Sequence, residues 1–202
     1  DGKTHLVYEL HITNFSVMAL TIGTIEVLSS GRRLAHFGAN DLGSMLSVVA
    51  SAPEPPGSAT PANARRLAPG RRAIAYLWVT LDNALVAPAA LRHRIVFEEG
   101  SLETYDVAID SAKPIVIGPP LRGGGWFAAN GPGNQSPHRR AVIPIAGKAV
   151  DAQRFATDWV RLGTNGKTFE GDSKSNAAYF AHGEDALAVA DGTVVDTKDG
   201  IP

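Results

Sequence analysis

The chain contains no cysteine. That absence excludes a disulfide framework, a cysteine-ligated zinc, an iron–sulfur cluster and a thiol nucleophile. Any metal bound by this sequence would have to be held by histidine and carboxylate side chains. The absence does not fix the compartment, because secreted proteins without disulfides are common.

An excess of positive charge is also missing. The 202 residues hold 19 Lys and Arg against 20 Asp and Glu, a formal net charge of −1. Nucleic-acid binders need a basic excess, so nucleic acid is not expected as a partner. No apolar run reaches the roughly 18 residues of a membrane span, so no membrane-spanning segment is expected. The sequence starts at Asp1 without a signal peptide, so we expect a processed product or a fragment.

Familiar catalytic motifs are absent too. The sequence has no nucleotide-binding glycine motif, no Gly-x-Ser-x-Gly and no His-Glu-x-x-His. The carboxylate pairs Glu98-Glu99 and Glu184-Asp185 are interpreted as solvated turn charges, because neighbours on a strand point to opposite faces.

Strand periodicity dominates residues 1–118. Apolar residues alternate with polar ones in Leu6–Ile12 and in Leu91–Phe97, which is typical of half-buried strands. Residues 73–81 are apolar on both faces and predict a central strand. Further strands are expected at 17–28, 104–110 and 113–117, a short helix at 41–49, and a loop at 50–64. The pattern predicts an all-β fold with an N-terminal β-sandwich, Ig-like, over residues 1–118.

The composition changes at Gly118–Gly125, where a proline pair precedes three consecutive glycines. This stretch predicts a domain boundary. Residues 119–202 then contain strand-like runs at 141–145, 153–162 and 186–195, with an exposed polar loop at 163–176. We expect a second, partial antiparallel β-sheet domain there.

Histidines are the remaining candidates for chemistry. His93 lies on the apolar face of its strand and is interpreted as a core histidine. His138, His182 and Asp158 all fall in the second segment. Imidazole and carboxylate together form the ligand set of a catalytic zinc, but the three show no close ligand spacing.

The second segment resembles the lysostaphin/LytM-type zinc metallopeptidases. The resemblance rests on Gln153-Arg-Phe-Ala-Thr-Asp-Trp159 and on Ala186-Leu-Ala-Val-Ala-Asp-Gly-Thr-Val-Val195, preceded by Trp126-Phe-Ala-Ala-Asn-Gly-Pro132. In that family a strand carrying His-x-x-x-Asp is followed by one of the form Val-x-Ala-x-x-x-Gly-x-Val. The resemblance implies a peptidase-type β domain over 119–202, with Asp158 as a zinc ligand.

Two departures qualify this resemblance. Arg154 stands where the family has its first histidine, and arginine does not ligate zinc. The family's later His-x-His has no counterpart up to Pro202. We therefore expect the metal ligands in this chain to be Asp158 and His138, and Arg154 and His182 to contact substrate. The C-terminal half of the domain, with its catalytic residues, is expected to be absent.

Three functions stay open from the sequence. The first is part of a secreted or periplasmic zinc metallopeptidase that hydrolyses peptide cross-links, such as those of peptidoglycan, and is inactive as this chain alone. Its partners would be that substrate and the missing C-terminal segment. The second is a non-catalytic homologue, which Arg154 favours. The third is a β-sandwich binding module that uses Trp78, Trp126 or Trp159 as a stacking platform, with Trp126 expected to be the most exposed.

Overall fold

The computed structural model describes residues 2–49, 65–82, 87–110 and 112–200. The all-β prediction is confirmed, because short antiparallel strands make up nearly all of the regular structure. The strands are β1 (Thr4–Thr13), β2 (Leu20–Ser29), β3 (Arg32–Phe37), β4 (Leu46–Val48), β5 (Arg66–Leu67), β6 (Arg72–Leu81), β7 (Ala90–Phe97), β8 (Gly100–Glu103), β9 (Val107–Ala108), β10 (Trp126–Asn130), β11 (Val142–Ile145), β12 (Lys148–Asp151) and β13 (Asp158–Arg161). The helix α1 spans Ala39–Met45, and two 3₁₀ turns span His138–Arg140 (η1) and Asn176–Ala178 (η2).

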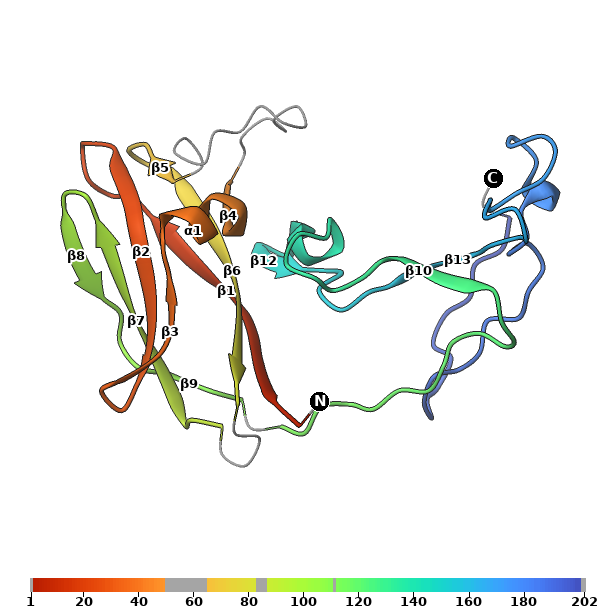
Figure 1. Cartoon of the computed structure of the whole chain (residues 1–202), viewed down its shortest axis with the longest axis horizontal. Helices are drawn as coiled ribbons and strands as arrows, with labels where there is room; N and C mark the ends of the chain where they lie inside the picture. The colour runs from red at the N-terminus through yellow and green to blue at the C-terminus, as the bar shows by residue number, and fades with distance from the viewer. Residues whose placement is uncertain (1, 50–64, 83–86, 111, 201–202) are drawn as a thin grey trace. The chain divides into compact units, whose positions relative to one another are not determined.

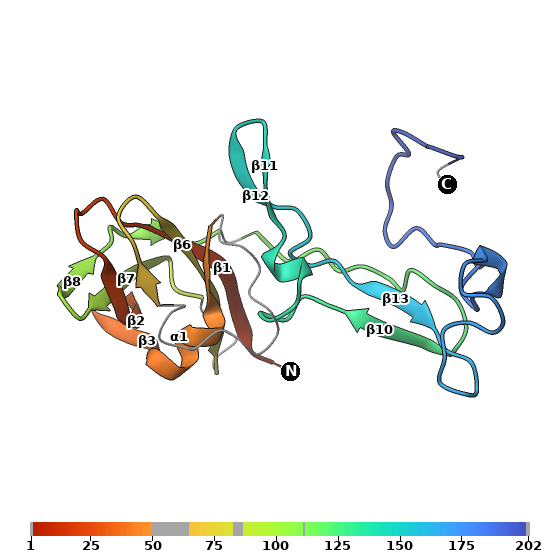
Figure 2. The same ribbon diagram turned by 90° about the horizontal axis from the view of Figure 1, so that it is seen from above.

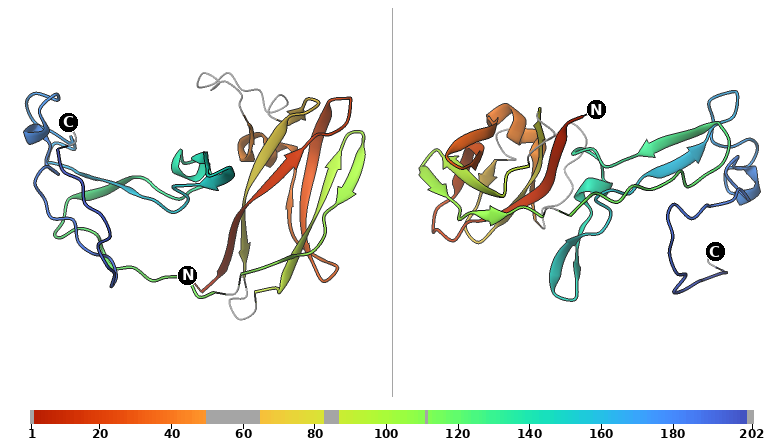
Figure 3. Two further views of the ribbon diagram at one scale, coloured as in Figure 1. Left: turned by 180° about the vertical axis from the view of Figure 1, so that it is seen from behind. Right: turned by 90° about the horizontal axis from the view of Figure 1, so that it is seen from below.

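Two antiparallel sheets form the N-terminal sandwich (Figures 1 and 3). One sheet has the order β1-β6-β4. The other has the order β3-β2-β7-β8, with β5 added to β2 and β9 added to β7. The central place of β6, and the apolar character of both its faces, were predicted correctly: Ala73, Ala75 and Leu77 face the core, and Ile74 and Tyr76 are buried on the other side.

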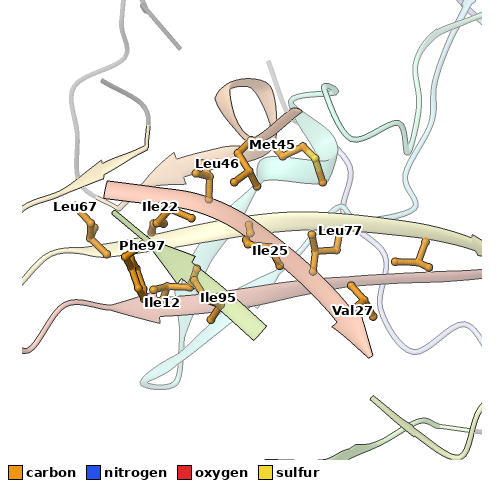
Figure 4. Packing of buried hydrophobic residues seen from close by; sticks show 14 of the residues in the cluster. Ile12, Ile22, Ile25, Val27, Met45, Leu46, Leu67, Leu77, Ile95 and Phe97 are labelled. Carbon is orange, nitrogen blue, oxygen red and sulfur yellow. The ribbon is translucent and has the colours of Figure 1, made fainter. Parts of the chain in front are cut away.

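The core lies between these two sheets (Figure 4). Ile22, Ile25 and Val27 of β2 are fully buried and meet residues of β1, β6 and β7. Leu42 and Met45 of α1 close one end of the core. Burial of a large aliphatic side chain contributes about 1.5–3 kcal/mol, so this cluster is the main source of stability in the sandwich.

Several expected strands differ from the structure. Residues 113–117 and 186–195 form no strand, and only Asp158–Arg161 of the run 153–162 does. The expected strand at 104–110 is reduced to β9. The helix predicted over 41–49 begins at Ala39 and ends at Met45, because Leu46 pairs with Ala75 as the start of β4. The predicted loop at 50–64 lies outside the described residues.

The chain divides into two compact units. The first comprises residues 1–111 together with Pro132–Arg154, and the second comprises Ala112–Gly131 together with residues 155–202. The domain division at residue 118 stays a prediction. Figure 2 shows the hairpin of β11 and β12 within the first unit, and the antiparallel pair of β10 and β13 within the second.

Residues 132–154 form a segment that we call the arm. Its residues 134–140 and Arg154 contact the outer face of the β1-β6-β4 sheet, whereas its β11–β12 hairpin is largely exposed. Asn134 of the arm donates a hydrogen bond from Nδ2 to the Tyr76 carbonyl at 3.0 Å. The guanidinium groups of Arg139 and Arg140 lie 5.3 and 5.0 Å from the centre of the Tyr76 ring. The arm explains why β6 is buried on both faces although one of them points away from the core.

Candidate functional site

A buried ionic cluster holds the arm to β1. Arg139 has no solvent exposure, and its Nη1 donates to Asp151 Oδ2 at 3.0 Å and also to the Glu9 carboxylate. Its Nη2 donates to the Tyr8 carbonyl at 3.0 Å. Glu9 also accepts from Arg154, whose Nε lies 3.2 Å from the same oxygen, Oε1, and whose Nη2 donates to Oε2.

The cluster is balanced in charge. Two arginines face two carboxylates that are almost completely buried, Glu9 and Asp151. Burial lowers the pKa of Arg139 from its ordinary value, and the nearby Asp151 carboxylate opposes this change. A buried charge is tolerated when it is paired and hydrogen-bonded, and each charge of this cluster has an opposite partner. Two of its buried atoms, Arg139 Nε and Asp151 Oδ1, have no hydrogen-bond partner among the described residues.

The side chain of Arg154 is therefore bound to the first unit. The sequence predicted a substrate contact for this residue, and that role stays a prediction. The structure places its guanidinium on Glu9 and Asp151, about two-thirds buried. Spacing along the chain could not reveal this contact, because Glu9 lies 145 residues away.

The expected metal ligands belong to different units. His138 is buried in η1 of the first unit, next to Arg139. Asp158 is exposed at the start of β13 in the second unit, where its Oδ2 accepts a hydrogen bond from Asn130 Nδ2 at 2.8 Å. Within the described parts of the chain, no group of three histidine or acidic residues is placed to hold a metal ion. The role of Asp158 and His138 as metal ligands stays a prediction.

His182 is exposed in the second unit. Its backbone N–H donates to the Tyr179 carbonyl at 3.0 Å and closes a turn. Around this turn Phe169 and Tyr179 form an isolated bridge, with their ring centres 5.3 Å apart. The predicted contact between His182 and a substrate stays a prediction.

The tryptophans differ from the expectation. Trp126 is half-buried, because its indole N–H donates to the Arg122 carbonyl and Arg161 lies 5.7 Å from its ring. Trp159 of β13 is the exposed one, at 42%. Trp78 is half-buried on β6 and donates from its indole to His5 Nδ1 at 3.1 Å.

His93 is a core histidine, as the sequence predicted. It is 4% exposed, and its Nε2 lies 2.8 Å from the Tyr8 hydroxyl. Burial lowers the pKa of His93 and raises that of Tyr8, so both side chains are neutral near pH 7.

Comparisons of the chain with protein-family models, with curated proteins and with solved structures find no match. No helix in the described residues is long and apolar enough to cross a membrane.

Proposed function

We propose that this chain is the β-sandwich and the first part of the peptidase-type domain of a lysostaphin-type metallopeptidase-like protein. The complete protein hydrolyses short peptide cross-links, such as those of peptidoglycan, in a secreted or periplasmic setting. This chain alone does not hydrolyse peptides. The β-sandwich is the accessory unit on which the peptidase-type part is built.

The observation that carries the proposal is the missing core of the second unit. Every buried apolar residue in the described structure belongs to the first unit. In the second unit no large apolar side chain of the described residues is fully buried: some, such as Phe169 and Phe180, are half-buried. The exposed ones are Ile115, Val116, Ile117, Phe127, Phe155, Trp159, Tyr179, Val194 and Val195. A domain with so little buried apolar surface does not offset its loss of chain entropy, so in this proposal further polypeptide covers these side chains.

The backbone of the second unit supports the same conclusion. The segment expected to be a strand at 186–195 makes only two backbone hydrogen bonds to residues 118–120. Leu187 donates to the Pro120 carbonyl at 2.8 Å, and Gly118 donates to the Val189 carbonyl at 2.7 Å. A strand becomes stable when a neighbouring strand pairs with it, and in the proposed complete domain that neighbour is supplied by additional chain.

In this proposal a zinc site is completed only by that additional chain. A catalytic zinc has about three protein ligands and one open position. Of the predicted ligands, Asp158 is exposed and suitable, whereas His138 is enclosed in the first unit beside the ionic cluster. In this proposal the remaining ligands come from residues outside this sequence.

The test is made on the encoding gene and its longer product. We expect the reading frame to continue beyond Pro202 into a glycine-rich turn followed by His-x-His. In the longer protein, amides around Val194 should become protected from hydrogen exchange, and one zinc should bind and be lost on Asp158→Ala. A longer product that leaves these amides unprotected would contradict the proposal.

A non-catalytic homologue is the second candidate, and one observation favours it. Arg154 occupies the position of the first family ligand and is bound to Glu9 rather than free to approach a metal. A longer protein that folds its second domain, with protected amides, but binds no zinc would establish this alternative.

A further inference from the structure

A cavity of about 480 Å³ opens between β1 and the β7–β9 side of the sandwich. Its walls are largely apolar, with Leu6 and Leu10 from one sheet and Leu91 and Ile109 from the other side. The volume lies in the range of small-molecule sites, roughly 300–1,000 Å³. All of its lining residues belong to the first unit.

Two polar side chains meet in this cavity, Tyr8 and His93. The Tyr8 hydroxyl and His93 Nε2 are 2.8 Å apart, and the rings meet edge to face with their centres 5.5 Å apart. The Tyr8 hydroxyl makes no other hydrogen bond to the described residues, so we assign it as the donor and Nε2 as the acceptor. This tautomer carries its proton on His93 Nδ1, which is buried and has no hydrogen-bond partner among the described residues. The Tyr8 oxygen then keeps lone pairs that can accept a hydrogen bond.

The charges around the cavity restrict what can bind there. The Tyr8–His93 pair is uncharged near neutral pH because both groups are partly desolvated. The acidic residues of the lining, Glu9 and Asp110, disfavour an anion, and the Glu9 carboxylate is already paired with Arg139 and Arg154. An apolar wall with the uncharged Tyr8 oxygen as an acceptor suits a neutral ligand that carries one donor.

We propose that this cavity is a binding site for a neutral, largely apolar small molecule that donates one hydrogen bond to the Tyr8 hydroxyl oxygen. The site belongs to the β-sandwich and is independent of the peptidase-type function proposed above. It gives the sandwich a ligand-binding role of its own.

The probes are two isomers that differ in one donor. 3-Methylindole keeps its ring N–H, and 1-methylindole has the same size but no donor. Each is titrated into the full chain, and methyl groups are observed by ¹H–¹³C NMR. We expect saturable shifts at Leu6, Leu91 and Ile109, with 3-methylindole binding about fivefold tighter, as one net hydrogen bond predicts.

Two substitutions test whether the Tyr8 hydroxyl causes the tighter binding of 3-methylindole. Tyr8→Phe should make the two isomers bind equally, whereas Tyr105→Phe, at an exposed tyrosine outside the cavity, should preserve the fivefold difference. If Tyr8→Phe does not fold, Ala108→Phe is used instead. Ala108 lines the cavity on β9, and filling it should abolish the shifts while leaving the Tyr8–His93 contact in place.

Three results would overturn the inference. Equal binding of the two isomers to the unsubstituted chain would remove the role of the Tyr8 oxygen. Shifts confined to residues 112–131 and 155–200 would place binding elsewhere. Binding that survives Ala108→Phe unchanged would show that the cavity is not the site.

Discussion

Arg139 offers the sharpest test of how the arm is attached to the sandwich. Its side chain is fully buried and donates to Glu9, to Asp151 and to the Tyr8 carbonyl. Arg139→Met keeps most of the volume and removes the charge and all three of these hydrogen bonds. Both carboxylates then depend on Arg154 alone, whose side chain is 35% exposed.

The expected loss of stability follows from this arrangement. Removing one partner of a buried ion pair costs about 3–5 kcal/mol, since the other charge stays buried without compensation. Because Arg154 still reaches both carboxylates, we expect the lower end, about 3 kcal/mol in the free energy of unfolding. Arg32→Met, at an exposed arginine of β3, is the control and should change that free energy by about 0.5 kcal/mol or less.

Urea unfolding of the full chain measures these values. Trp78 fluorescence reports on the first unit when Trp126 and Trp159 are both replaced by Phe. In the double variant Arg139→Met/Asp151→Asn the uncompensated charge is partly removed. Its loss should therefore fall short of the sum of the single losses by about 1–2 kcal/mol. Additive losses, or a loss of less than about 1 kcal/mol for Arg139→Met, would refute the reasoning.

Three further predictions concern other parts of the chain. Burial lowers the pKa of His93, so the unfolded state binds a proton more readily than the folded state, and the free energy of unfolding should fall as pH drops below about 6.5. His93→Gln should flatten this pH dependence in urea melts. An unchanged slope would show that the pH dependence does not come from His93. Asn14→Ala removes side-chain hydrogen bonds to two backbone carbonyls in a site that is 1% exposed, and should cost about 2 kcal/mol in the same melts; a change below about 0.5 kcal/mol would be inconsistent with the buried amide. A Cβ at Gly163 would lie 2.7 Å from the Phe180 ring, so Gly163→Ala should shift the ring proton resonances of Phe180, whereas Gly124→Ala, in open space, should leave them in place.

The sandwich could be predicted from the sequence because the alternation of apolar and polar residues along a strand is a local pattern. Alternation along β1 and β7 placed Leu6, Leu91 and His93 on inward faces, and the structure buries all three. The two apolar faces of β6 correctly indicated a central strand. What covers its outer face was not predictable, because the contact between Glu9 and Arg139 joins residues 130 positions apart and leaves no periodic pattern.

In the second segment, local sequence patterns did not predict which residues form strands. Residues 113–117 and 186–195 have the composition of strands, yet a strand also needs a partner, and propensity does not supply one. The placement of the two predicted metal ligands on different units could not be foreseen from the sequence either. His138 and Asp158 are close in the sequence, but the arm carries His138 into the first unit, while Asp158 begins β13 in the second.

Zinc binding by this chain tests the functional proposal most directly. Native mass spectrometry of the purified chain, with zinc added in slight excess, reports the bound metal per molecule, and a glycine-rich peptide reports hydrolysis. We expect the zinc-free mass to dominate and the peptide to remain intact. One zinc per chain, lost on Asp158→Ala and accompanied by cleavage of the peptide, would contradict the proposal that the metal site requires residues beyond this sequence.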